Sequence, residues 1–83
     1  MKNNTTMEQP NIGKIIKEVL RKQGRSITWL AQQMGTTRNL VYKMFDREII
    51  YTDRLLQISE LLEYDFFKHY SEYLGERKKE KNL

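Results

Sequence analysis

Apolar residues recur along this chain with the period of a helix, in five separate groups. The first group consists of Ile12, Ile15, Ile16, Val19 and Leu20. This three- and four-residue spacing predicts a helix, and Gly24 supplies a residue type that ends helices. The other groups follow residues that commonly cap helix N-termini, namely Ser26, Thr37, Thr52 and Asp65. The pattern therefore predicts five helices and no strands.

The third predicted helix has two unlike faces. Val41 and Met44 fall on one side, whereas Leu40 and Phe45 fall between the faces. The opposite side is polar and carries Arg38, Asn39, Tyr42 and Lys43. Gly35 ends the second helix just before this unit. We expect two short helices joined by a tight turn, with the polar side of the second one exposed.

The remaining apolar positions predict the core. The second helix contributes Ile27, Leu30, Ala31 and Met34. The fourth is apolar around most of its circumference, as a central helix is: Leu55, Leu56, Ile58, Leu61 and Leu62. Aromatic residues of the fifth, from Phe66 to Tyr73, are expected to close the core, with a subunit contact up to Leu74 as the alternative. Trp29 is expected to pack over the first helix or the following loop.

Length and composition exclude several classes of protein. The chain has 83 residues, no cysteine and one histidine, His69. One domain of this size has too thin a core for a deep cofactor or substrate cleft, and thiolate or multi-histidine metal sites are absent. We predict a flexible arm over 1–10, one helical domain over 11–74 and a charged tail over 75–83. No apolar segment predicts a membrane span or a secretory signal, so we expect a cytoplasmic, nucleoid-associated protein.

Charge is divided unevenly along the chain. Residues 1–51 hold nine Lys and Arg against four Asp and Glu, a net of +5, whereas residues 52–83 hold six against seven, a net of −1. A basic half beside a nearly neutral one suits a protein that presents one face to a polyanion.

This order of elements resembles the Cro-like (phage-repressor, XRE-type) helix-turn-helix family. The similar positions are Leu30-Ala31, Gly35, Thr36-Thr37 and inward-facing Val41 and Met44, together with the Leu-rich fourth helix and Asp65-Phe66-Phe67. The resemblance runs from Ile12 to about Tyr70. It implies a compact, all-α, five-helix lambda-repressor-like fold whose third helix enters the major groove of DNA. Two positions depart from the family: Ile27 replaces a frequent Gln, and Phe45-Asp46-Arg47 replaces a Glu-x-Gly step.

The polar side of the third helix carries the chemistry of base recognition. Arg donates in a fork to guanine O6 and N7, and Asn pairs with adenine N6 and N7. We predict base contacts from Arg38, Asn39, Tyr42 and Lys43, three of which, Arg38, Asn39 and Lys43, match positions that the family uses. Predicted phosphate contacts come from the starts of helices and from the loop after the third helix: Ile27, Thr28, Thr37, Arg47, Tyr51 and Thr52.

These observations predict a DNA-binding transcriptional regulator, a repressor acting as a homodimer on a palindromic operator. No cofactor and no small-molecule substrate are expected. We do not expect an enzyme, because the sequence offers no nucleophile–base pair, carboxylate pair or phosphate loop and the core is too small to shelter one. One alternative is a protein-interaction module, such as an antitoxin or anti-repressor, with secondary DNA binding; a second exposed apolar surface would favour it. RNA binding is a weaker alternative because the tyrosines form no stacking platform.

Overall fold

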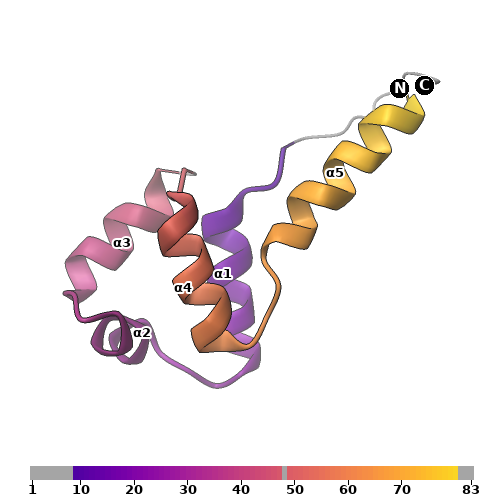
Figure 1. Ribbon diagram of the computed structural model, residues 1–83. Coiled ribbons are helices and arrows are strands. Elements are labelled where there is room, and N and C mark those ends of the chain that lie inside the picture. The colour runs from indigo at the N-terminus through magenta and orange to yellow at the C-terminus, as the bar shows by residue number, and fades with distance from the viewer. Residues whose placement is uncertain (1–8, 48, 81–83) are drawn as a thin grey trace.

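Five helices and no strands make up the part of the chain that the structure describes (Figure 1). This computed structural model describes residues 9–47 and 49–80, with side chains as far as residue 77. The helices are α1 (Ile12–Lys22), α2 (Ile27–Met34), α3 (Arg38–Asp46), α4 (Thr52–Leu62) and α5 (Phe67–Glu80). The predicted all-α class is confirmed. Most of the expected N-terminal arm and the last three residues of the expected tail lie outside the described residues.

Side-chain caps explain where three helices begin. Asn11 accepts a hydrogen bond from the Lys14 N–H at the start of α1. Ser26 and Thr37 do the same for α2 and α3, accepting from the N–H groups three residues on at 3.0 and 3.2 Å. Both of these caps were predicted. The predicted cap at Thr52 is wrong: it is the first helical residue of α4, and the N-cap is Tyr51, which makes no side-chain cap hydrogen bond.

A three-residue turn joins α2 to α3. Gly35 has a φ of 70°, in the left-handed region, which a residue without a side chain adopts easily. The N–H of Thr36 then donates to the Ala31 carbonyl at 2.9 Å, which closes the end of α2. Figure 1 views α2 almost along its axis and α3 from the side, so the two helices cross steeply. The turn thereby fixes the orientation of α3 relative to α2.

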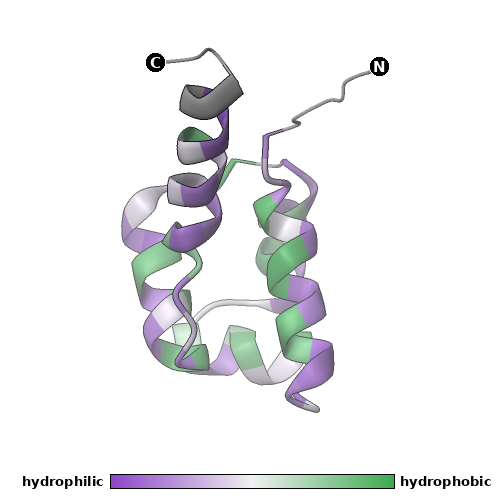
Figure 2. Cartoon of the chain, turned by 90° about the vertical axis from the view of Figure 1, so that its right-hand side faces the viewer, coloured by the Kyte–Doolittle hydropathy of each residue, from purple (hydrophilic) through white to green (hydrophobic). Residues whose placement is uncertain are grey.

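All five helices contribute to or border one apolar core. Its fully buried side chains are Phe66, Ile12, Ile16, Leu30, Ile58, Leu62 and Val41. Every helix carries both hydrophobic and hydrophilic stretches, as Figure 2 shows. Phe45, unplaced by the sequence pattern, is buried, whereas Leu40 is 54% exposed. The apolar circumference of α4 is buried only in part, because Leu55, Ile58 and Leu62 lie in the core whereas Leu56 is 52% exposed.

The segment between α1 and α2 is tied to the end of α4. The Gln23 side-chain amide donates to the Leu62 carbonyl at 2.9 Å, and the Arg25 guanidinium donates to the Leu61 carbonyl at 3.2 Å. Arg25 also lies over the Trp29 ring, 4.2 Å from its centroid. The half-buried Trp29 therefore packs against the core and under this loop residue, as predicted.

The α5 helix begins on the core and then leaves it. Phe66 is fully buried and lies against the Tyr64 ring in a tilted arrangement at a centroid distance of 4.5 Å, so it closes the core as expected. Beyond this point α5 projects away from the other helices (Figure 1), and Leu74 is 63% exposed. The helix continues past the predicted domain boundary at residue 74, as far as Glu80. Burial removes Phe66 from any surface available to a second subunit.

Gly13 allows α1 and α3 to approach each other closely. A Cβ atom added at Gly13 would collide with the carbonyl oxygen of Phe45 and lie 3.0 Å from the Phe45 Cα. Because both obstacles belong to backbone, no side-chain rotation relieves them. The start of α1 therefore sets the position of the C-terminal half of α3.

We expect the substitution Gly13→Ala to destabilise the domain by about 1–3 kcal/mol, the usual cost of forcing extra volume into a packed interior. Thermal unfolding followed by circular dichroism measures the change. Gly75→Ala is the matched control, because nothing lies within 4 Å of a Cβ at that position in α5. Equal melting temperatures for the two variants would contradict the close approach of α1 and α3.

Candidate nucleic-acid interface

The polar side of α3 faces outward over a buried apolar side. The four residues with predicted base contacts, Arg38, Asn39, Tyr42 and Lys43, are all exposed. On the opposite side of the same helix, Val41 is completely buried and Phe45 is 4% exposed. Because α3 is anchored by these two side chains, its polar face is held in a fixed orientation relative to the domain. The side chains on that face are thus positioned by packing behind them.

Two predicted contact residues from different helices come together at the start of α3. The Arg38 guanidinium donates to the Thr28 hydroxyl at 3.5 Å, the outer limit of hydrogen-bond distance. This contact is long, so Arg38 keeps its guanidinium donors for another acceptor. It also brings a residue of α2 with a predicted phosphate contact next to a residue of α3 with a predicted base contact.

The first turn of α2 offers unpaired backbone donors. The Ser26 hydroxyl takes the Trp29 N–H, which leaves the N–H groups of Ile27 and Thr28 without an intrahelical acceptor. The positive end of the helix dipole adds to their attraction for an anion. The Ile27 side chain packs against the core while Thr28 is exposed. Ile27 can therefore contribute only its backbone, and Thr28 both backbone and hydroxyl.

Thr37 has a structural role that limits its part in binding. Its hydroxyl oxygen accepts from the Leu40 N–H at 3.2 Å and so caps α3. The hydroxyl hydrogen is still able to donate to a phosphate oxygen, because a hydroxyl both donates and accepts. Thr37 is therefore needed for the start of α3 whether or not it touches a ligand.

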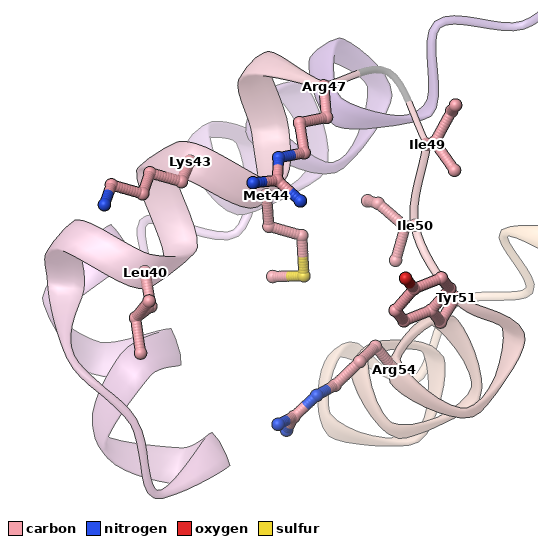
Figure 3. A pocket seen from close by; sticks show the side chains of 8 residues that line it. All are labelled: Leu40, Lys43, Met44, Arg47, Ile49, Ile50, Tyr51 and Arg54. Atoms are coloured by element: carbon pink, nitrogen blue, oxygen red, sulfur yellow. The ribbon is translucent and has the colours of Figure 1, made fainter.

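Three further predicted residues gather at the other end of α3. Arg47 and Tyr51 line one hollow together with Lys43, with a volume of about 510 Å³ (Figure 3). Tyr51 is 76% exposed. Thr52 is exposed too, but the neighbouring Asp53 carboxylate occupies the first turn of α4, where it accepts from the Arg54 N–H at 2.8 Å. A negative charge there opposes a phosphate, so Thr52 is the weakest of the predicted phosphate contacts.

The cations on this surface form no ion pair with another residue that the structure describes. Among the described residues, the ion pair is Arg21 with Glu18 on α1, and the Arg21 hydrogen bond lowers the pKa of the Glu18 carboxyl. No described carboxylate pairs with Arg38, Lys43 or Arg47. The cations of α3 and its C-terminal end are thus available to a negatively charged partner.

Comparison with known protein families, curated proteins and solved structures gave no match. The interpretation of this surface therefore depends on its residues and their geometry. Among the residues that the structure describes, no group of three or more His, Cys, Asp and Glu is arranged to hold a metal ion. None of the helices, within that same part of the chain, combines the length and apolar character that crossing a membrane requires.

Sequence reasoning missed part of the hollow beside α3. Its other lining residues are Leu40, Met44, Ile49, Ile50 and Arg54. Leu40 could not be placed from periodicity, because it falls between the two faces of a short helix. Ile49 and Ile50 lie in the connection between helices, where apolar spacing carries no directional information. The position of Arg54 could have been predicted, because it lies three residues after Tyr51 and therefore on nearly the same side of the chain.

Proposed function

We propose that this protein is a sequence-specific double-stranded DNA-binding transcriptional regulator, a repressor with a lambda-repressor-like helix-turn-helix. In this proposal α2 and α3 form the motif, and α3 lies in the major groove. The observation that carries it is the single exposed face of Arg38, Asn39, Tyr42 and Lys43 above a buried Val41. Bound to an operator, the protein would block the access of polymerase.

The donors on this face suit particular base edges. Arg38 has unpaired guanidinium donors for guanine O6 and N7, and Asn39 has the donor and acceptor that adenine N6 and N7 require. Both lie in the first turn of α3, the end that contacts base edges in this type of motif. Lys43 is another donor, and Tyr42, one turn after Arg38, suits a thymine methyl or a phosphate.

Phosphate contacts on both sides would position the helix in the groove. The N–H groups of Ile27 and Thr28 suit one strand, and Arg47 and Tyr51 suit the other, with Thr37 and Thr52 adding hydroxyls. Such contacts fix register and orientation without reading sequence. Arg47 pairs with no described carboxylate, which makes it the strongest of them.

One such module reads few base pairs, which is too little to identify a site in a genome. We therefore propose a homodimer on a palindromic operator with half-sites about one helical turn apart. The projecting part of α5 supports this proposal, because its Tyr73 is only partly buried and its Leu74 is exposed.

Binding to duplex DNA should weaken strongly with salt. Each phosphate neutralised by a cation releases counterions, so raising salt from about 50 to about 200 mM should reduce affinity at least about tenfold. Fluorescence anisotropy with a labelled duplex measures this dependence, and Arg47→Gln should make the slope shallower. Lys68→Gln, an exposed cation on α5, is the control and should leave the slope unchanged. Affinity that does not vary with salt would contradict phosphate contacts by this surface.

A further inference from the structure

The hollow between α3 and the start of α4 has an apolar lining that DNA binding does not explain. Its apolar residues are Leu40 and Met44 from α3, Ile49 and Ile50 from the connection, and Tyr51 at the cap of α4. Figure 3 shows Met44 and Ile50 reaching into the space between α3 and α4. We call this surface the α3–α4 groove. Three of its side chains are largely in water: Leu40 at 54%, Ile49 at 73% and Tyr51 at 76% exposed.

Cations surround the apolar residues of the groove. Lys43 lies on α3, Arg47 follows it as the C-cap of the same helix, and Arg54 lies opposite on α4 (Figure 3). Arg54 donates to the Gln57 side chain at 3.3 Å, and none of the three pairs with a described carboxylate. The α3–α4 groove therefore combines exposed aliphatic surface with three cations that form no ion pair with a described carboxylate.

We propose that the α3–α4 groove binds an acidic, amphipathic helical segment of a partner protein. Leu, Ile, Phe or Trp side chains on one face of that segment would cover the aliphatic residues. Asp and Glu beside them would pair with Lys43, Arg47 and Arg54. Charge complementarity determines the occupant, because only a ligand that is both apolar and anionic satisfies the two parts of the surface.

Other possible occupants of the α3–α4 groove complement either its cations or its apolar residues, but not both. A DNA backbone matches the cations but leaves Ile49 and Leu40 exposed to water. A second copy of this chain, related by a two-fold axis, brings the same cations toward each other, which is electrostatically unfavourable. A small anion would keep much of its own surface in water, because the lining residues Leu40, Ile49 and Tyr51 are themselves largely exposed to solvent. A helical segment is large enough to cover the apolar residues from α3, from the connection and from the start of α4 together.

The proposal has a regulatory consequence that rests on the proposed function. Lys43, Arg47 and Tyr51 belong both to the groove and to the surface assigned to DNA. A segment bound in the groove would therefore exclude DNA, and the partner would relieve repression. Binding of the segment itself does not require that the chain bind DNA, so the two proposals fail separately.

Selection from a displayed library of random peptides, panned on the full chain without DNA, tests the inference. We expect enriched peptides with Asp and Glu around aliphatic or aromatic anchors. The enriched peptide, synthesised with a fluorescent label, is then titrated by anisotropy. Ile49→Ser should weaken its binding about tenfold, the value of one buried aliphatic side chain. Arg54→Gln should weaken it several-fold and reduce its salt dependence.

Leu56→Ser is the matched control, since it removes an exposed aliphatic side chain of α4 that does not line the groove. It should leave peptide affinity unchanged. The inference would be overturned if no peptide were enriched or if the enriched peptides were basic. It would also be overturned if Ile49→Ser left the affinity for the enriched peptide unchanged. Self-association abolished by Ile49→Ser would overturn it in favour of a second copy. A parallel titration of the same chain with duplex DNA distinguishes the two proposals. If the chain binds the peptide but not DNA, only the proposed function and its regulatory consequence are refuted.

Discussion

A chain carrying Val41→Asp should lose its cooperative unfolding transition. Val41 is fully buried on the inner side of α3, where a carboxylate would have no described partner. An unpaired buried charge costs several kcal/mol, and a domain of this size has only about 5 kcal/mol of stability or somewhat more. Circular dichroism during heating measures the loss. The same change would release α3 from the orientation on which the proposed function depends.

The control places the same substitution one residue along the chain. Tyr42 is 44% exposed on the outer side of α3, so Tyr42→Asp should unfold cooperatively near the wild-type temperature. Similar melting temperatures for the two aspartate variants would show that α3 does not pack on the side described. A folded Tyr42→Asp beside an unfolded Val41→Asp would establish which face of α3 is inward.

The double variant Arg38→Ala, Asn39→Ala should lose most of its sequence-specific affinity while remaining folded. Each bidentate base contact is worth about 1–3 kcal/mol per half-site, so the two together should weaken binding by at least about thirtyfold. Anisotropy with the preferred duplex measures the loss. Affinity for an unrelated duplex should change less, because the phosphate contacts remain.

Lys68→Ala removes an exposed cation of α5 that has no part in the proposed DNA surface, and the variant should bind the preferred duplex as the wild type does. Unchanged specificity in the double variant would show that α3 does not read bases. An equal loss on preferred and unrelated duplexes would reassign Arg38 from base recognition to phosphate contact.

Local sequence chemistry predicted the helices well, because helix formation depends on residues close in sequence. The caps at Ser26 and Thr37 are examples, since each satisfies an N–H three residues away. Gly24 and Gly35 have the positive φ angles that their positions after α1 and α2 suggested. The buried side of α3 at Val41 also followed from spacing alone.

Features that depend on distant residues were not predictable in this way. Gly13 is needed only because Phe45 passes next to it, a contact between α1 and α3 that no local pattern indicates. Leu56 is exposed because none of the described helices covers that side of α4. The α3–α4 groove likewise forms from three separate segments. The predicted cap at Thr52 failed because the helix begins one residue earlier than expected, with the non-helical N-cap conformation at Tyr51 and Thr52 already helical.

Selection from a pool of random duplexes, with the wild-type chain and with the double variant Arg38→Ala, Asn39→Ala, tests the central claim most directly. For the wild type we expect a palindrome with guanine and adenine in half-sites about one helical turn apart. The double variant should enrich no such sequence. Enrichment of the same palindrome by both chains, or of none by the wild type, would contradict recognition of DNA through the exposed face of α3.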